Sequence, residues 1–268
     1  MKKVTLAETP AVGSVHPDLS GASVKQLINR STVGSHRGML SVAEFEPGGM
    51  HKLHRHPHAA QISYLMSGTA EHLTENGPVS IKSGDMVYSE KNEWHGFRNS
   101  GTSPAVLVTL YSPSAELAEC GYESFVGRPD LSKAPRVKKV SLDDLQGDVA
   151  LDEGAGFIGL GVFWLATRDT VGTDTFLLGA STFEPGGLHE FHRHPNGDEI
   201  LFILEGGGEH LTLDGAISLS AGEIAYIPAN EYHGFRNKAG VLTKTLFGYF
   251  GPATLEEAGY QIQLDDSK

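Results

Sequence analysis

Short segments of apolar or alternating residues, separated by glycine-rich turns, run through most of the chain. In the C-terminal half, residues 200–204 form an uninterrupted apolar run that ends at Gly206. Such a run between turn signals predicts a buried strand. Residues 209–213 and 216–219 flank Asp214-Gly215, and Asp-Gly between two such segments is typical of a type I′ hairpin turn.

The same pattern predicts further strands at residues 222–228 and 241–249. The N-terminal half carries Asn76-Gly77 at the matching hairpin position. Short helices are expected at residues 114–119 and 252–258, because a glycine follows each of them closely. Strands at this density with glycine-rich turns predict an all-β fold, either a small antiparallel barrel or a jelly roll.

The chain contains an internal repeat. A shift of 138 positions brings residues 24–122 into register with residues 162–260 without a gap. Phe-Glu-Pro-Gly-Gly, Glu-His-Leu-Thr and His-Gly-Phe-Arg-Asn each occur once in either half, which indicates two units of one fold. We predict an N-terminal domain at 1–127, with residues 1–23 as an arm across the barrel or a partner. The C-terminal domain is predicted at 128–268, with residues 128–152 as a solvated linker.

Composition narrows the class of partner. The 268 residues carry a formal charge of −12 without a basic cluster, so nucleic acid and anionic membrane surfaces are poor partners. Cys120 is the single cysteine, which excludes an intramolecular disulfide. The first ten residues lack the apolar region of a secretory signal. No apolar run approaches 18 residues, so we expect no membrane span and a soluble, cytoplasmic protein.

Histidine is the residue type that the repeat reproduces most clearly. Ten of the 13 histidines form five pairs separated by the repeat length. His192 and His194 are two positions apart, so both imidazoles leave the same face of an extended strand. Glu199 follows nearby, and His233 lies on a later strand. Three imidazoles and one carboxylate form a ligand set for a divalent transition metal, and burying them without a cation would be costly.

The N-terminal copy has the same three imidazoles but a different fourth residue. Its predicted ligands are His54, His56, Gln61 and His95. Glutamine offers a carbonyl oxygen without charge, so an ion there would carry one more net positive charge and bind less tightly. Two interpretations stay open: a degenerate site, or a second active centre with different properties.

These spacings resemble the motifs of the cupin superfamily. Its first motif, Gly, five residues, His-x-His, three or four residues, Glu, six residues, Gly, is met by Gly186, His192, His194, Glu199 and Gly206. Its second motif is met by Gly222, Pro228, His233 and Asn237, with a departure at Asn230. The N-terminal copy departs at Gln61, Glu90 and Asn92.

The resemblance implies a bicupin, with two tandem double-stranded β-helix (jelly-roll) barrels that each end in a short helix. It also implies one divalent transition metal per domain. Fe²⁺ is the preferred ion, and Mn²⁺, Ni²⁺, Cu²⁺ and Zn²⁺ are alternatives. The motifs are specific for the fold and much less so for the reaction.

Further histidines are candidates for proton transfer. His72 and His210 lie on the strand after the buried run, where they face either the cavity, as general acid or base, or solvent. His51 and His189 precede the first ligand by three positions, at the opposite strand parity. Two interpretations stay open: a loop at the barrel mouth, where they carry protons or contact substrate, or imidazoles that support the ligands or are exposed. The predicted catalytic residues are His192, His194, Glu199, His233, His210 and His72.

A metal with this ligand set keeps two adjacent positions open for substrate oxygens or dioxygen. The first hypothesis is therefore a dioxygenase that uses O₂ on a small enolic, phenolic or dicarbonyl substrate. The second is a redox-neutral isomerase, lyase or decarboxylase, and the third is a non-catalytic protein that binds a small metabolite. The apolar strand at residues 62–66 is expected to be exposed, and its face and the counterpart at 200–204 to suit pairing of barrels, within the chain or in a homodimer.

Overall fold

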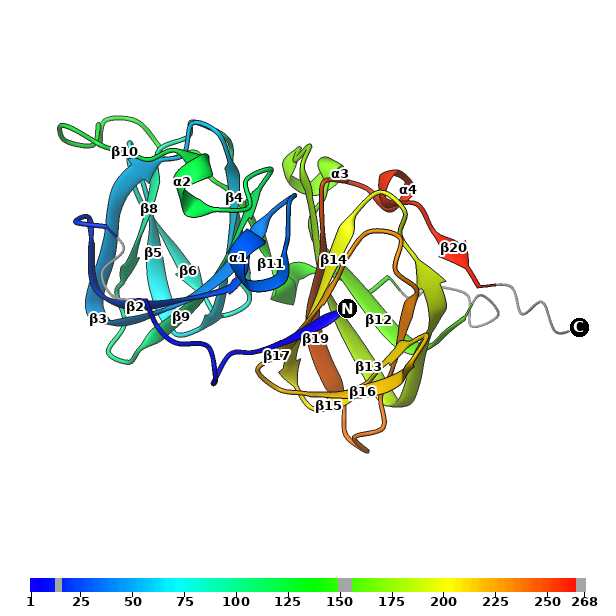
Figure 1. Cartoon of the computed structure of the whole chain (residues 1–268). Coiled ribbons are helices and arrows are strands. Elements are labelled where there is room, and N and C mark those ends of the chain that lie inside the picture. Colours follow the sequence, from blue (N-terminus) through cyan, green and yellow to red (C-terminus); the bar gives the residue numbers. More distant parts are fainter. Residues whose placement is uncertain (13–15, 149–155, 264–268) are drawn as a thin grey trace, which may run out of the picture. The chain divides into compact units, whose positions relative to one another are not determined.

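A computed structural model describes residues 1–12, 16–148 and 156–263. The chain forms two compact units (Figure 1). The first barrel comprises residues 9–144, and the second barrel comprises residues 1–8 together with 145–268. Each unit contains a 10-stranded sheet of antiparallel pairs that curls into a jelly-roll barrel. The predicted all-β fold of two tandem barrels is confirmed.

In the first barrel, β2 and β10 pair with β3, and the remaining strands follow the order β11-β7-β4-β9-β3-β8-β5-β6. The bounds are β2 (Leu19–Ile28), β3 (Met39–Arg55), β4 (Ala60–Ser67), β5 (Thr69–Thr74), β6 (Gly77–Lys82), β7 (Asp85–Ser89), β8 (His95–Asn99), β9 (Ala105–Ser112), β10 (Glu123–Ser124) and β11 (Lys138–Ser141).

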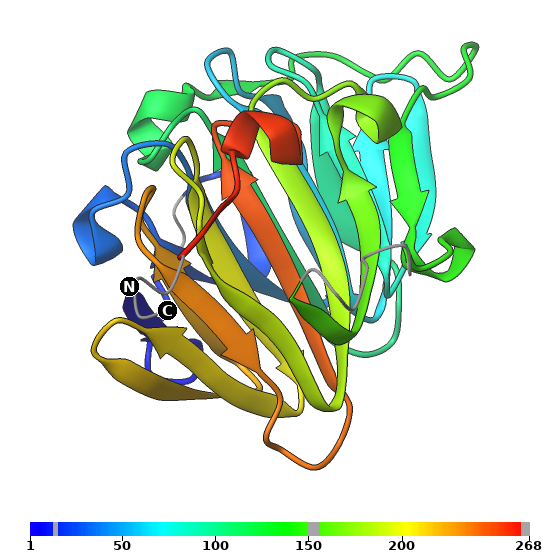
Figure 2. The same cartoon turned by 90° about the vertical axis from the view of Figure 1, so that its right-hand side faces the viewer.

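The second barrel repeats this order as β1-β17-β14-β19-β13-β18-β15-β16, with β12 and β20 on β13. Figure 2 shows its long strands side by side. The bounds are β1 (Lys2–Thr5), β12 (Phe157–Ala166), β13 (Phe176–Arg193), β14 (Asp198–Glu205), β15 (Gly207–Thr212), β16 (Gly215–Ser220), β17 (Glu223–Ile227), β18 (His233–Arg236), β19 (Thr243–Phe250) and β20 (Gln261–Ile262).

Helices are short in the described residues. α2 (Leu117–Cys120) and α4 (Leu255–Ala258) correspond to the two predicted helices, and η1 (Leu142–Asp144) is a 3₁₀ turn. Two further helices, α1 (Arg30–Val33) and α3 (Arg168–Val171), were not predicted because four residues carry no helical period. Capping boxes at Asn29 and Thr167 begin them. None of these helices has the length and apolarity to cross a bilayer.

Each barrel has one edge strand that comes from outside its own repeat in the sequence. β1, with the sequence Lys-Lys-Val-Thr, pairs with β17 of the second barrel, so that Lys2 lies opposite Tyr226. β11, with the sequence Lys-Lys-Val-Ser, pairs with β7 of the first barrel, so that Lys138 lies opposite Tyr88. Each barrel is therefore completed by the segment that precedes the other repeat.

This exchange corrects the predicted domain organisation. The boundaries differ from 1–127 and 128–268, because residues 1–8 belong to the second barrel and residues 128–144 to the first. Part of the predicted linker is the strand β11 and the turn η1, and not a solvated connection. Its last residues, 149–152, lie outside the described residues.

The apolar interior of each barrel comes from alternate positions on facing strands. Phe45, Leu65 and Phe97 lie in the core of the first barrel, and their counterparts Phe183, Ile203 and Phe235 lie in that of the second. The expectation of an exposed apolar strand at 62–66 is wrong, whereas the buried strand predicted at 200–204 is confirmed. Their large side chains are buried within the chain, apart from half-buried residues at 66 and 204.

Candidate metal centres

A β-bulge in β13 brings candidate ligands of the second barrel together. The register between β13 and β18 shifts between His189 and His192, and His192 then lies opposite His233. A bulge inserts one residue and turns the side chains that follow it. Gly234 is required here, because a Cβ atom would lie 3.0 Å from the carbonyl oxygens of His189 and Glu190. The bulge and the glycine therefore set where the two imidazoles meet.

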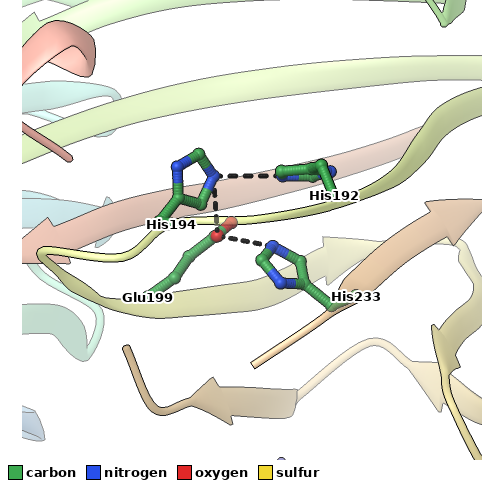
Figure 3. Close-up of side chains that lie close together, drawn as sticks. All are labelled: His192, His194, Glu199 and His233. Atoms are coloured by element: carbon green, nitrogen blue, oxygen red, sulfur yellow. Dashed lines mark hydrogen bonds and ion pairs between the residues drawn. The ribbon is translucent and has the colours of Figure 1, made fainter. Parts of the chain in front are cut away.

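Four side chains of the second barrel converge on one point (Figure 3). Nε2 of His192 lies 3.0 Å from Nε2 of His194, and Nε2 of His233 lies 2.8 Å from Oε2 of Glu199. His194 Nε2 is 3.5 Å from the same oxygen. All four residues are buried, with ligand atoms within 4.8 Å of one another. Adjacent ligands about 2.1 Å from an octahedral ion lie about 3.0 Å apart, so the separations fit a transition-metal shell.

Backbone carbonyl groups determine which ring nitrogen faces the centre. Each candidate imidazole places Nδ1 against a carbonyl oxygen, which can only accept a hydrogen bond. Nδ1 therefore carries the proton and Nε2 presents a lone pair, the arrangement found in metal-binding histidines. The Nδ1 to oxygen distances are 2.7 Å for His54, 2.7 Å for His56, 2.9 Å for His95, 2.7 Å for His192, 2.5 Å for His194 and 3.0 Å for His233.

Several of the converging atoms have no hydrogen-bond partner. These buried atoms are Nε2 of His54 and Nε2 of His56, while Nε2 of His233 and Oε2 of Glu199 have only each other, as the ion pair at 2.8 Å. Leaving such an atom unsatisfied costs about 1–3 kcal/mol. Lone pairs that face one another at about 3 Å also repel, unless a cation or a proton lies between them. The donor set of the second barrel therefore fits a divalent transition metal.

In the second barrel, Glu199 and His233 favour each other's charged forms. Burial by itself would raise the pKa of the Glu199 carboxyl, but His233 and His194 lower that pKa to about 2. Glu199 in turn raises the pKa of His233 against the effect of burial. Burial lowers the pKa values of His192 and His194, so these rings are neutral near neutral pH. Neutral imidazole and ionised carboxylate are the forms that bind metals.

The first barrel brings together His54, His56 and His95, all buried. Oε1 of Gln61 lies 3.0 Å from Nε2 of His95, while Nε2 of Gln61 donates to Oγ of Ser63 at 2.9 Å. The serine therefore turns the amide oxygen towards the imidazoles. Burial lowers the pKa of each of the three histidines. The set fits an ion, although it supplies no negative charge.

The structure places His51 and His189 beside the ligands, as the second interpretation expected. Both lie within strands, not on a loop at the mouth, and their rings stack on the next ligand. The ring centroids are 3.8 Å apart for His51 and His54, and 4.1 Å apart for His189 and His192. A register shift separates the two members of each pair. Because the bulge adds one residue, it restores the parity that three positions would otherwise reverse.

His72 and His210 face the cavities, not solvent. His210 is fully buried, and neither of its ring nitrogens has a hydrogen-bond partner. Its ring lies parallel to that of His233, with centroids 5.8 Å apart. Burial lowers the pKa of His210 to about 3 and that of His72 to about 4. Both are thus neutral imidazoles beside the candidate centres.

Each centre opens into a cavity within its own barrel. The cavity volume is about 280 Å³ in the first barrel and about 220 Å³ in the second. Among the described residues that line either cavity, none is lysine or arginine. The wall of the second cavity is rich in aromatic side chains. Its aromatic residues are Phe157, Trp164, Phe183, Phe235, Phe247, Tyr249 and Tyr260.

Two tyrosines belong to these sites although sequence analysis did not select them. Oη of Tyr249 lies 3.1 Å from Nε2 of His194. The ring of Tyr111, its counterpart, lies 5.3 Å from the ring of His56. A signal was present in the sequence, because both are tyrosine at the repeat spacing, on β9 and β19.

Comparison with known families agrees with this geometry. The family model of the cupin domain matches residues 41–111 and 179–246, one region in each barrel. The chain belongs to the cupin superfamily. With two such domains it is a bicupin, as the motifs predicted.

Curated relatives of this bicupin include bacterial proteins about as long as one of its two domains. The tetracenomycin polyketide synthase protein TcmJ of Streptomyces glaucescens is 29% identical over 133 residues, which cover 49% of this chain and 89% of TcmJ. The pectin degradation protein KdgF of Dickeya dadantii is 32% identical over 75 residues, covering 28% of this chain and 67% of KdgF.

Solved structures similar to the bicupin include oxalate decarboxylases. A mutant of the Bacillus subtilis enzyme OxdC has a TM-score of 0.73 at 16% identity, covering 94% of this chain and 77% of that one. The Lactobacillus farciminis enzyme in its formate complex has a TM-score of 0.70 at 16% identity, with coverage of 93% and 86%. At this identity the likeness shows the fold alone.

Proposed function

We propose that this bicupin is a metal-dependent enzyme whose second barrel acts on an apolar substrate with enolic, phenolic or dicarbonyl oxygens. The observation that carries the proposal is the cavity of the second barrel. It joins Glu199 and two of the three ligand imidazoles, those of His194 and His233, to a wall of aromatic and aliphatic side chains. Fe²⁺ is the first ion to test, and Mn²⁺ is the second because it is named for one of the oxalate decarboxylase structures.

The charge of the cavity argues against a small dianion such as oxalate as the substrate of the second barrel. Glu199 leaves a divalent ion with one net positive charge, and no described lining residue supplies another cation. A second carboxylate would therefore be buried without a partner, which is unfavourable. An apolar ring with two oxygens avoids this cost, because it carries no second charge. Its apolar body contacts Phe235 and Phe247 while its oxygens face the centre.

The protein supplies positioning and a proton acceptor. A bound divalent ion would hold and polarise the substrate oxygens and, in the case of iron, would give electrons a route to dioxygen. His192, His194, His233 and Glu199 would hold that ion. His210 is a neutral imidazole inside the cavity, and its free nitrogens can accept a hydrogen bond from an enol or a phenol. Because burial lowers its pKa to about 3, full proton transfer to this ring would require a bound metal that acidifies the hydroxyl. The apolar wall keeps water away from the reacting atoms.

Oxygen consumption tests the first reaction, a dioxygenation. Protein loaded with metal under anaerobic conditions is mixed with catechols, enols and β-dicarbonyl compounds, and oxygen is then admitted. Uptake by the wild type that is absent from His192→Ala supports the proposal. Protein loaded in turn with Fe, Cu, Ni and Mn that never consumes oxygen with any of these compounds would exclude a dioxygenase.

A redox-neutral isomerase, lyase or decarboxylase is the second candidate, and His210 favours it. A base beside a polarising metal is sufficient for proton transfer without oxygen. Turnover that requires metal and His210 but proceeds unchanged under argon would identify this class. Tight binding without any conversion would instead identify the third hypothesis, a metabolite-binding protein.

A further inference from the structure

Three adjacent strands of the first barrel place hydroxyl groups at one level of the cavity. Thr109 on β9 lies opposite Ser41 on β3 and opposite Ser63 on β4. All three side chains line the cavity and are 4–7% exposed. We call Ser41, Thr109 and Ser63 the hydroxyl row. It lies in the same cavity as Gln61 and the three imidazoles.

The second barrel has no such row at the equivalent positions. Phe247 lies opposite Gly179 and opposite Leu201 there. The Phe247 ring occupies the space above Gly179, because a Cβ atom on that glycine would lie 2.5 Å from the ring. The same level of the fold is therefore polar in one barrel and apolar in the other.

The hydroxyl row retains hydrogen-bonding capacity. Oγ of Ser41 is buried without a partner. Oγ1 of Thr109 makes a long contact of 3.5 Å to the carbonyl oxygen of Ser41 and also hydrogen-bonds to the side chain of Tyr111, but it can accept a further hydrogen bond. Oγ of Ser63 accepts from Gln61 and still has its own proton to donate. A buried hydroxyl without a partner is unfavourable by about 1–3 kcal/mol, so a ligand that supplies acceptors would relieve this cost.

The two cavities also differ in charge. The described residues that line the first cavity include no aspartate, glutamate, lysine or arginine, whereas Glu199 lines the second. An anionic ligand would thus meet a repelling carboxylate in the second cavity and none in the first. With an ion held by three imidazoles and Gln61, the first cavity carries the full charge of that ion.

We infer that the first barrel is a separate binding site for a small carboxylate that also bears hydroxyl or carbonyl oxygens. The carboxylate faces His54, His56, His95 and Gln61. The remaining oxygens accept hydrogen bonds from the hydroxyl row. The two barrels therefore bind ligands of different chemistry: a small polar anion in the first and an apolar ring in the second.

Calorimetric titration of the full-length, metal-loaded protein with glycolate tests this inference. Glycolate is expected to bind at one site per chain. The double variant Ser41→Ala/Thr109→Val, which removes two hydroxyls with little change of shape, should weaken binding at least about tenfold. Gln61→Glu should weaken it as well, because it adds a repelling carboxylate. His192→Ala, in the other barrel, should leave the affinity unchanged.

The second barrel offers a matched control. Ser181 and Thr245 are also a buried serine and threonine on neighbouring strands, but their hydroxyls satisfy one another at 2.6 Å. Ser181→Ala/Thr245→Val makes the same chemical changes and should not affect glycolate binding. Metal content and melting temperature verify that each variant folds, and Thr109→Val alone replaces the double variant if that one does not fold.

Three outcomes would overturn the inference: no glycolate binding by the wild type, equal affinity in the hydroxyl-row variant, or loss of binding in His192→Ala. The last would place the ligand in the second barrel. Since oxygen uptake that is lost in His192→Ala reports on the second barrel, failure of this inference is distinguishable from failure of the proposed enzymatic function.

Discussion

Gln61 presents Oε1 3.0 Å from Nε2 of His95, the place that Oε2 of Glu199 takes at 2.8 Å from His233. The two barrels thus place a side-chain oxygen at the matching position beside the last histidine, and there they differ by one unit of negative charge. At this range a unit charge contributes on the order of 1–4 kcal/mol, depending on the local dielectric constant.

The first prediction concerns metal affinity. Gln61→Glu should raise the affinity of the first centre at least about tenfold, because it supplies the missing charge. Elemental analysis after dialysis against a graded series of chelator concentrations measures this. His192→Ala provides the reference, since it should remove only the metal of the second barrel. Equal retention of metal by the wild type and Gln61→Glu would contradict the prediction.

The second prediction is a loss of stability in acid. His72 is buried in the first barrel, and its pKa falls from 6.5 to about 4 because of burial. Below pH 6.5 the unfolded chain binds a proton that the folded chain does not, so stability falls as the pH drops from 6.5 towards 4. This group alone should remove about 2 kcal/mol from metal-free protein between about pH 7.5 and about pH 5.

Urea unfolding of the metal-free protein at both pH values measures this effect. His72→Leu should reduce the acid-induced loss of unfolding free energy by that amount, because leucine binds no proton in the folded or the unfolded state. His58→Ala, at an exposed position, is the matched control and should behave like the wild type. An unchanged pH dependence in His72→Leu would argue against a neutral buried ring at this position.

The exchanged edge strand leads to the third prediction. A fragment of residues 9–144 contains β11 and should unfold cooperatively as a monomer. A fragment of residues 1–127 lacks β11, which leaves the edge of β7 unpaired and prone to association. Its own β1 has almost the sequence of β11, so two copies should exchange these strands and dimerise.

Sedimentation velocity distinguishes the fragments. Deletion of residues 1–8 from the 1–127 fragment should abolish its dimer, since β1, the strand that would replace β11, is then absent. A monomeric 1–127 fragment as stable as 9–144 would show that β11 contributes nothing to the first barrel.

The fourth prediction assigns a structural role to the motif asparagine. The Asn237 amide donates to the carbonyl oxygens of Phe183, Glu184 and Val241, at 2.9, 3.1 and 2.7 Å, and accepts from the backbone of Ala239 at 2.8 Å. Asn237→Ala should lower the free energy of unfolding by about 2–4 kcal/mol, because it leaves buried backbone groups unsatisfied.

Thermal unfolding and metal analysis together test that role. The melting temperature should fall while the metal content of the folded protein stays unchanged, since Asn237 is not among the converging ligand groups. A loss of metal without a loss of stability would show that the asparagine acts on the centre instead.

The sequence alone determined the features that depend on short spacings and on the repeat. Strand periodicity, the Asp214-Gly215 turn and the shift of 138 positions were sufficient for two β-barrels, because each is a local or a self-consistent pattern. The His-x-His spacing likewise predicted that His192 and His194 share one face, and in the structure their Nε2 atoms lie 3.0 Å apart.

Tertiary structure decided what depends on pairing between distant segments. The alternation of side chains along a regular strand predicted that His51 points away from the face of His54. This is wrong, because a bulge that only the strand register reveals adds a residue between them. The exchange of β1 and β11 was hidden for a similar reason, since edge pairing does not follow chain order. Ser41, Thr109 and Ser63 form a row only because three strands align there, and long-range register has no signature in any single segment.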